Sequence, residues 1–163
     1  MSSEARQPVH VSVAVRVRPL AKNEGAAAFE TSETAVVEVS DGAAQQEFGF
    51  ERVFGPSAST QDVYDAVAAP IVAAAFEGTN GTILAYGQTG SGKTRTMFGQ
   101  RDDPGLLPLA MADLFARAAA AADGVETLVR ASMLELNNEE VRDLIALSGG
   151  ERPRPPPGGP PPK

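Results

Sequence analysis

The feature that most constrains this chain is a glycine-rich run near its middle. It matches the phosphate-binding loop pattern, a glycine, four variable residues and then Gly-Lys-[Ser/Thr]. The run consists of Gly87, Gln88, Thr89, Gly90, Ser91, Gly92, Lys93 and Thr94. Glycines let the backbone curl so that successive N–H groups point into one anion-binding concavity. Lys93 offers a positive charge to the terminal phosphates and Thr94 a hydroxyl to the accompanying Mg²⁺, so we predict a nucleotide-phosphate site.

The flanks of this run fit the structural context that the pattern requires. Residues 82–86 are a short apolar run of strand-forming residues that follows a turn signal, and residues 93–98 contain neither glycine nor proline. Strand, glycine loop and helix in succession favour the phosphate loop over the alternative, a Gly/Ser-rich surface loop that fits the pattern by chance.

Composition narrows the class of protein. The 163 residues fit a single domain, and 42% of them are hydrophobic, which is enough for a core. Cysteine is absent and His10 is the only histidine, so disulfides, thiolate catalysis and multi-histidine metal sites are excluded. The net charge of −7 argues against a nucleic-acid surface. Without a signal peptide or a long apolar span in the sequence, we expect a soluble intracellular protein that does not enter membranes.

Strand patterns dominate the N-terminal third. Alternating valines predict a strand over residues 9–17 that ends before Pro19. Arg16 and Arg18 share a face at its end, either as solvated edge residues or as ligand contacts. Residues 21–32 are expected to be loop. Two further strands are predicted over residues 34–40 and 45–53, around the turn pair Asp41–Gly42. The aromatic residues expected in the core are Phe48, Phe50 and Phe54.

Helical patterns follow. Ser59 and Asp62 form a capping-box pattern, and a helix is predicted from there to Gly78, with a kink or a lost hydrogen bond at Pro70. Its expected apolar face consists of Val63, Val67, Ile71 and Ala74. After an interruption at residues 99–105, a second helix is predicted from Pro108, a favourable first-turn residue, to about residues 123–124. Its expected apolar stripe consists of Leu107, Met111, Leu114, Phe115 and Ala118.

The C-terminal part is predicted to hold a strand over residues 125–136 and then a short helix through Leu144, capped by Asn137 or Asn138. From Ser148 the composition changes to proline and glycine, which have nothing to bury, and we expect a disordered tail. The predicted organisation is therefore a polar extension over residues 1–8, a folded part over residues 9–147 and a tail over residues 148–163.

Several separated stretches, in order, resemble the N-terminal half of a kinesin motor domain. They are residues 15–20, 50–54, 61–64, 78–97, 105–108 and 132–144. The resemblance implies an α/β fold of the P-loop NTPase class with helices flanking a central sheet. It also implies ATP and Mg²⁺ as ligands, ADP as product and microtubules as partner in the cytoplasmic cytoskeleton. The residues that it makes candidate contacts of the nucleotide base are Arg16, Arg18, Pro19 and Arg95.

The departures from this family are informative. Kinesins sense the γ-phosphate and position the attacking water with an Asn-x-x-Ser-Ser-Arg-Ser-His stretch and an Asp-x-x-Gly-x-Glu stretch, and neither is present. The stretch that begins at Asp143 does not match the Asp-x-x-Gly-x-Glu pattern, because the third residue after the aspartate is not glycine. No catalytic residue is therefore assigned within the chain. Arg95 stands where the family commonly has histidine or an aromatic residue, and Met133 and Asn137 stand where tyrosines are usual.

The resemblance also bears on folding. Strands from the C-terminal half of a kinesin motor domain lie between those of the N-terminal half, so the predicted strands at residues 82–86 and 125–136 would lack neighbours. Unpaired strands leave backbone groups unsatisfied. We therefore expect an incomplete central sheet, either because the chain is partial or because it packs in an improvised way. The sequence does not indicate the kinesin subfamily, direction, cargo or oligomeric state.

Three functions remain open at this point. The first is a kinesin-like microtubule motor, in which ATP hydrolysis drives movement. The second is a catalytically silent fragment that binds nucleotide without turning it over, because both switches and the microtubule-binding surface are missing. The third, a small-molecule kinase, ranks last because no arginine-rich segment for a lid follows Leu136.

Overall fold

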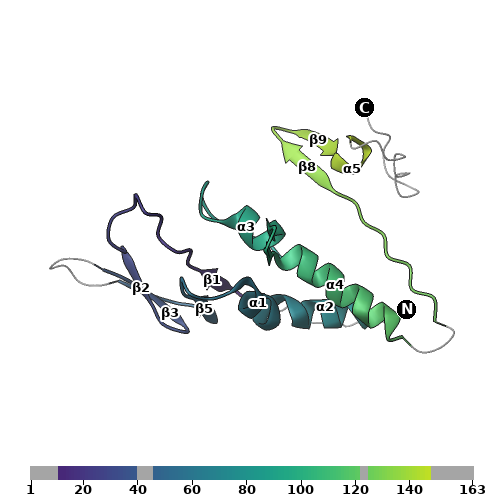
Figure 1. Ribbon diagram of the computed structural model, residues 1–163, viewed down its shortest axis with the longest axis horizontal. Coiled ribbons are helices and arrows are strands. Elements are labelled where there is room, and N and C mark those ends of the chain that lie inside the picture. Colours follow the sequence, from purple (N-terminus) through teal and green to yellow (C-terminus); the bar gives the residue numbers. More distant parts are fainter. Residues whose placement is uncertain (1–10, 40–45, 122–124, 148–163) are drawn as a thin grey trace, which may run out of the picture. The chain divides into compact units, whose positions relative to one another are not determined.

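The computed structural model describes residues 11–39, 46–121 and 125–147 of the chain (Figure 1). The chain divides into two compact units, residues 1–121 and residues 122–163. The first unit contains two small sheets, a hairpin and the helices around the glycine-rich loop. The second contains a β-hairpin and a single helical turn.

A two-stranded parallel sheet starts the first unit. Strand β1 (Ala14–Arg16) pairs with β5 (Arg52–Phe54), and Val15 lies opposite Val53. Beyond β1, the Val17 N–H donates to the Phe54 carbonyl over 2.8 Å, which continues the pairing by one residue. The alternating valines thus form a strand as predicted, although a shorter one, and residues 9–10 lie outside the described residues.

An antiparallel sheet with the order β2-β3-β4 follows, formed by β2 (Phe29–Thr31), β3 (Ala35–Glu38) and β4 (Glu47–Gly49). The strand predicted over residues 34–40 is confirmed in β3. The loop predicted over residues 21–32 is wrong at its end, because β2 pairs there with β3.

The strand predicted over residues 45–53 is divided in two. Its first half, β4, pairs with β3, whereas its second half belongs to β5 and pairs with β1 in the other sheet. Of the aromatic residues expected in the core, Phe54 is buried, Phe50 is half-buried and Phe48 is 40% exposed. The turn pair Asp41–Gly42 lies outside the described residues.

The first helix begins with the predicted capping box. Ser59 Oγ accepts the Asp62 N–H over 3.1 Å, and the Asp62 carboxylate accepts the Ser59 N–H over 2.8 Å. These hydrogen bonds to Ser59, first of its side chain and then of its backbone, hold the pKa of Asp62 below its usual value. Helix α1 (Thr60–Val63) starts from this cap.

The helix continues through a π-helical turn, which corrects the predicted apolar face. After α1 comes the π-helix η1 (Tyr64–Ala68) and then α2 (Ala69–Phe76). The Ala69 N–H bonds to the Tyr64 carbonyl, five residues back, just before Pro70, which has no N–H to donate. This turn holds one more residue than an α-helical turn. The buried positions after it are therefore shifted by one residue toward the C-terminus, to Ala68 and Val72 in place of the predicted Val67 and Ile71. The buried apolar residues of α1, η1 and α2 are Val63, Tyr64, Ala68 and Val72.

Helix α3 (Lys93–Phe98) follows the glycine-rich loop as predicted. It ends at Gly99, which has a positive φ of 80° and opens a tight hairpin of β6 (Gly99–Gln100) and β7 (Asp103–Pro104). The hairpin brings the backbones at Gly99 and Gly105 together. A Cβ at Gly99 would lie 2.2 Å from the Gly105 nitrogen, so a side chain has no room there.

Helix α4 (Leu106–Ala119) starts two residues before the predicted position, so that Pro108 lies in its first turn, as expected. It lies alongside α2 (Figure 1). Its predicted stripe is partly wrong, because Leu107 and Phe115 are 39% and 54% exposed while Leu106 is buried. The buried core of the unit consists of Phe54, Val63, Tyr64, Ala68 and Leu106.

A polar bridge joins η1 to α4 at the edge of this core. The Tyr64 hydroxyl donates to Asp113 over 2.9 Å, and Arg117 Nε donates to the other carboxylate oxygen over 2.8 Å. Tyr64 is 5% exposed. Burial, followed by the hydrogen bond to Asp113, raises the pKa of Tyr64 to about 12. Hydrogen bonds from Arg117 and Tyr64 lower the pKa of Asp113.

The strand predicted over residues 82–86 does not form. Within the described ranges, the backbone of these residues pairs with no strand and makes no hydrogen bond. Ile83 packs against the core, whereas Leu84 and Tyr86 are 84% and 96% exposed. A strand needs a neighbour to satisfy its N–H and C=O groups, and the structure provides none here.

In the second unit, the strand predicted over residues 125–136 and the short helix predicted after it both differ from the structure. Only the end of the strand predicted over residues 125–136 forms, as β8 (Leu134–Asn137). The predicted short helix is instead strand β9 (Glu140–Asp143), which pairs with β8 through a turn at Asn138 and Glu139 with φ of 46° and 72°. Helix α5 (Leu144–Leu147) comes after it.

The described residues therefore form a mixed α/β structure with small sheets, of which the β1–β5 pair is parallel. Within these residues, no helix has the length and apolar character needed to cross a membrane.

Candidate functional site

The glycine-rich loop has a backbone that depends on its glycines. Gly90 and Gly92 have positive φ values of 81° and 102°, a region that other residues rarely adopt. Gly87 has a φ of 155°, which side-chain-bearing residues rarely adopt, and a Cβ there would lie 3.2 Å from Ser91 Cβ and 2.6 Å from its Oγ. The Ser91 N–H donates to the Gln88 carbonyl over 3.2 Å, which closes the turn. Gly92 then serves as the N-cap of α3.

The Lys93 ammonium lies on the loop that precedes it. Its Nζ donates to the Gly87 carbonyl over 2.7 Å and to the Gln88 carbonyl over 2.9 Å. The positive charge is therefore held over the loop by two neutral acceptors rather than by a carboxylate. A charged phosphate oxygen is a stronger acceptor than a carbonyl, so it can take over these hydrogen bonds.

Thr94, the predicted Mg²⁺ contact, is an exposed residue in the first turn of α3, and its hydroxyl makes no hydrogen bond within the described residues. The exposed part of the loop itself comprises Gln88, Thr89 and Gly90. The described residues contain no group of three His, Asp or Glu side chains that could hold a metal ion. Mg²⁺ in nucleotide sites commonly takes one or two protein ligands and completes its shell with phosphate oxygens and water, and the Thr94 hydroxyl fits that role.

Arg16, a predicted base contact, joins three elements. From the end of β1, its Nη1 donates to Thr96 Oγ1 in α3 and its Nη2 to Thr60 Oγ1 in α1, both over 3.0 Å. Thr60 is only 1% exposed. Burial lowers the pKa of Arg16, against the opposing influence of Asp103 nearby.

Arg18 and Pro19, the other two candidates at this strand end, lie in a separate cluster. Arg18 forms an ion pair with Glu24 and also donates to the Pro19 carbonyl over 3.1 Å. The Glu24 carboxylate accepts the Ala21 N–H over 2.8 Å as well. The hydrogen bonds from Arg18 and then from Ala21 hold the pKa of Glu24 at about 2. Both Arg18 and Pro19 are exposed.

Arg95, the last candidate base contact, projects from the first turn of α3 and pairs with Asp103 of β7, with 3.2 Å between Nη2 and Oδ2. Its side chain is 54% exposed. Asp103 and Arg95 both influence the pKa of Arg16, in opposite directions, so the three charges lie in one neighbourhood beside α3.

The structure thus brings Arg16 and Arg95 into one neighbourhood beside α3, and the Lys93 ammonium lies on the loop. Arg18 instead pairs with Glu24, and Pro19 is bonded to Arg18 through its carbonyl. Sequence reasoning missed three partners, Thr60, Thr96 and Asp103. The hydrogen bonds of Arg16 connect residues 44 and 80 positions apart, so no local pattern could have revealed them.

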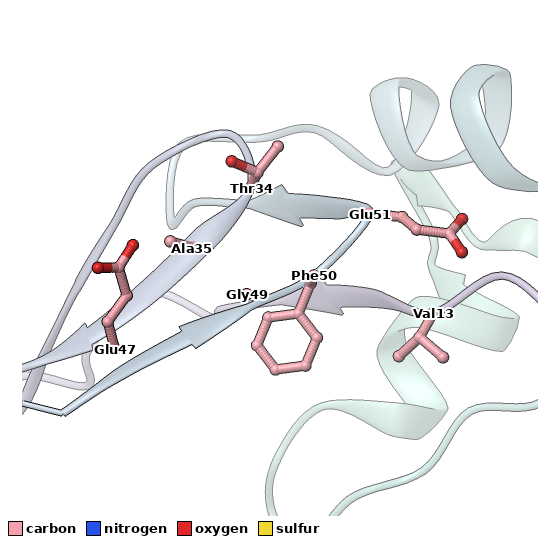
Figure 2. Close-up of a pocket in the computed structure, with 7 residues that line it drawn as sticks. All are labelled: Val13, Thr34, Ala35, Glu47, Gly49, Phe50 and Glu51. Atoms are coloured by element: carbon pink, nitrogen blue, oxygen red, sulfur yellow. The ribbon is translucent and has the colours of Figure 1, made fainter.

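A separate hollow of about 700 Å³ lies over the two sheets (Figure 2). Its lining consists of Val13, Thr34, Ala35, Glu47, Gly49, Phe50 and Glu51. Glu47 and Glu51 lie at opposite ends of it, and none of the described residues that line it is a lysine or an arginine (Figure 2). The two carboxylates repel phosphate, so this hollow is less suited to a nucleotide than the glycine-rich loop is.

A glycine loop with positive φ values, followed by a lysine at the start of a helix, is characteristic of the phosphate-binding loops of NTPases. Comparison with known families agrees and is more specific. Residues 11–155 match the model of the kinesin motor domain, so the chain belongs to the kinesin motor domain family.

Individual relatives extend this finding. The mitochondrial kinesin-like protein KIN-7D of Arabidopsis thaliana is 43% identical over 145 residues, which is 85% of this chain and 13% of the relative. The chloroplastic kinesin-like protein KIN-7K of Oryza sativa is 43% identical over 143 residues, again 85% and 13%. The human centromere-associated protein E is 42% identical over 140 residues, 83% of this chain and 5% of that protein. The chain therefore spans only a small part of the length of these relatives.

Proposed function

We propose that these residues form the ATP-binding part of a kinesin-like microtubule motor. Membership of the kinesin motor domain family supports the class of protein. The observation that carries the site is the position of Lys93, whose ammonium is held over the loop by the carbonyls of Gly87 and Gln88. In this proposal the whole protein hydrolyses ATP to ADP and moves along microtubules in the cytoplasmic cytoskeleton.

Each part of the loop has a role in this proposal. The backbone N–H groups between Gly87 and Gly92 surround the phosphates, and the Lys93 ammonium exchanges its two carbonyl acceptors for phosphate oxygens. Thr94 holds Mg²⁺, which neutralises charge on the bound phosphates. Arg95 is the candidate residue for stacking on the base, because it is the most exposed of the three cations around α3.

The test is binding of a fluorescent ATP analogue to the 163-residue chain. Lys93→Ala should weaken binding by at least about tenfold, since it removes a charged hydrogen bond to phosphate. Removing Mg²⁺ with EDTA should weaken binding of the parent as well. Lys22→Ala is the matched control, because Lys22 is an exposed lysine outside the loop. Equal affinity of the parent and Lys93→Ala would refute the proposed site.

A second function is favoured by one sequence observation. The chain contains neither of the two switch stretches that position the attacking water and sense the γ-phosphate in kinesins. Without such groups the loop stabilises the bound ground state and leaves the barrier to hydrolysis high. By themselves, these 163 residues then bind ATP without efficient turnover, and losses on the order of 10³–10⁵ in rate are typical when such groups are missing.

Phosphate release and cosedimentation with microtubules separate the two functions. The net charge of −7 opposes adhesion to the acidic microtubule surface, so we expect neither cosedimentation nor stimulated phosphate release for the isolated chain. Microtubule-stimulated hydrolysis that disappears in Lys93→Ala would instead show that these residues suffice for motor ATPase activity. Nucleic acid and membranes are not partners in either proposal.

A further inference from the structure

Strand β4 lies at the edge of the sheet β2-β3-β4, with β3 on one side and no strand on the other within the described residues. In an antiparallel ladder, successive residues direct their backbone groups alternately toward the neighbouring strand and away from it. The Phe50 N–H donates to the Thr34 carbonyl over 2.8 Å, so the backbone groups of Glu47 and Gly49 are directed outward. They make no hydrogen bond within the described part of the chain.

The hollow over the two sheets has its open space beside this strand. Glu47 and Gly49 are two residues apart and therefore share a face of the sheet, and Ala35 of β3 lies opposite Gly49 (Figure 2). A Cβ added at Gly49 would meet no other atom within 4 Å. The hollow therefore has room for an additional side chain next to Gly49.

The charge of the hollow comes from Glu47 and Glu51, which are both exposed. Neither forms an ion pair with a described residue, and Glu51 accepts a hydrogen bond from the neutral Ser12 hydroxyl. Four residues of extended chain separate the two carboxylates, a backbone distance of about 13 Å. One metal ion cannot bridge that distance, so two separate cationic groups are needed to neutralise the hollow.

These features define the partner that fits the edge. An extended peptide can add a strand to an open sheet edge, where its backbone supplies affinity and its alternate side chains supply specificity. The residues placed opposite Glu47, Gly49 and Glu51 then occupy every second position of that peptide. A second copy of β4 would bring glutamates opposite glutamates, which is destabilising. Lysine or arginine at the two outer positions and an apolar residue at the middle one complement the edge.

We propose that the outer edge of β4 binds an extended basic segment of another protein, with the pattern basic-x-apolar-x-basic, as an additional antiparallel strand. The backbone of that segment bonds to the outward groups of Glu47 and Gly49. Its two cationic side chains lie beside Glu47 and Glu51, and its apolar side chain enters the hollow at Gly49. The lining of the hollow includes no residue of the glycine-rich loop, so this inference is independent of the proposed nucleotide site.

Fluorescence anisotropy of a labelled peptide that contains Lys-Thr-Val-Thr-Lys, titrated with the 163-residue chain, tests the proposal. Gly49→Val fills the open space with a strand-forming residue and should raise the Kd by at least about tenfold while the circular dichroism spectrum stays that of the parent. Replacing both Glu47 and Glu51 by glutamine should raise the Kd about fivefold to tenfold and reduce its dependence on salt. If Gly49→Val does not fold, this double variant decides the question.

Glu38→Gln is the matched control, because Glu38 is an exposed glutamate of β3 and its side chain belongs to the opposite face of the sheet. Its Kd should equal that of the parent. Lys93→Ala should also bind the peptide like the parent, which keeps this test separate from the test of the nucleotide site.

Variants of the peptide test the backbone pairing. N-methylation of the valine blocks an N–H that faces β4 and should abolish binding, whereas N-methylation of the preceding threonine blocks an N–H that faces away and should leave the Kd unchanged. A peptide with both lysines replaced by glutamate should not bind, because its charges then oppose those of the hollow.

Several results would overturn the proposal. They are absence of binding to the parent at about 1 mM chain, equal affinity of the parent and Gly49→Val, equal effects of the two N-methylations, and loss of binding in Lys93→Ala. Self-association of the parent that Gly49→Val abolishes, without peptide binding, would show that a second copy occupies this edge instead. Binding that depends on Gly49, on the two glutamates and on the valine N–H would support the proposed strand addition.

Discussion

Replacing Tyr64 by phenylalanine tests whether the polar bridge between η1 and α4 stabilises the fold. The substitution removes one hydroxyl from a residue that is 5% exposed and leaves its ring packed in the core. Asp113 loses one donor but keeps the hydrogen bond from Arg117 over 2.8 Å. The change therefore isolates a single hydrogen bond to a charged acceptor.

The expected loss follows from the surroundings of that acceptor. Hydrogen bonds to charged groups contribute about 1.5–3 kcal/mol. The Asp113 side chain is 22% exposed, so water can replace part of what is lost. We expect Tyr64→Phe to lower the free energy of unfolding by about 1–1.5 kcal/mol, which corresponds to a fall in Tm of roughly 2–6 °C for a chain of this size.

Thermal and urea unfolding followed by circular dichroism measure this loss. Tyr86→Phe is the control, because the Tyr86 side chain is 96% exposed and should change stability by less than about 0.5 kcal/mol. Equal stability of Tyr64→Phe and the parent would show that water replaces the Tyr64 hydroxyl without cost, and the reasoning would be refuted.

The control variant also reports the pKa of Tyr64. The chain contains two tyrosines and no tryptophan, so Tyr86→Phe leaves Tyr64 as the only group that forms tyrosinate. Its absorbance should titrate with a midpoint near pH 12. Because the folded-state pKa lies above the usual value of about 10, this group stabilises the fold below pH 10 and the contribution is lost as pH rises toward 12. A midpoint near pH 10 in the folded protein would contradict the buried, hydrogen-bonded hydroxyl.

Three further predictions concern the backbone and the carboxylates. Glu139→Gly should raise the free energy of unfolding of the hairpin unit by about 1 kcal/mol, because Glu139 has a φ of 72°; faster amide exchange in β8 would contradict this. Gly99→Ala should destabilise the first unit by more than about 2 kcal/mol in urea unfolding, since the added Cβ would lie 2.2 Å from the Gly105 nitrogen, and an unchanged midpoint would show that the hairpin adapts. Asp62 and Asp113 have lowered pKa values, so their contributions are present at neutral pH and are lost as pH falls below about 4; unfolding curves that coincide at pH 7 and pH 3 would show otherwise.

Patterns that act over a few residues were sufficient to predict parts of this fold. The capping box at Ser59 and the helix after Gly92 form as expected, because their hydrogen bonds connect neighbours in the sequence. The valine alternation also predicted β1. By contrast, β2 and the division of residues 45–53 depend on which strand pairs with which, and that choice is made by contacts distant in sequence.

The misses in the second unit have a different cause. The turn at Asn138 and Glu139 is left-handed at both residues without a glycine, so the usual signal for a two-residue hairpin is absent. The two asparagines at positions 137 and 138 were therefore interpreted as the cap of a helix. Residues 82–86 show the opposite case, in which strand-forming residues are present but no partner is available within the described residues.

For the candidate site, too, only the residues that belong to a local pattern could be predicted from the sequence. The loop glycines, Lys93 and Thr94 follow from spacing alone. Arg16 and Arg95 are candidates through the family resemblance alone, and their role as base contacts stays a prediction. Their partners Thr96 and Asp103 depend on the folded arrangement of β1, α3 and the β6–β7 hairpin. The charges that surround those two arginines, and the degree to which each is buried, are visible only in the structure.

The π-helical turn at η1 makes the number of residues in this helix as important as their identity. Each residue of an α-helix turns the chain by about 100°, so deleting one residue from η1 would rotate α1 relative to α2 by that angle. Thr60 would then face away from Arg16 while Val72 stayed in the core. Single-residue insertions and deletions between Thr60 and Val72 should therefore be tolerated far less than substitutions, and a comparison of natural variants in this stretch should show a fixed length with variable residues.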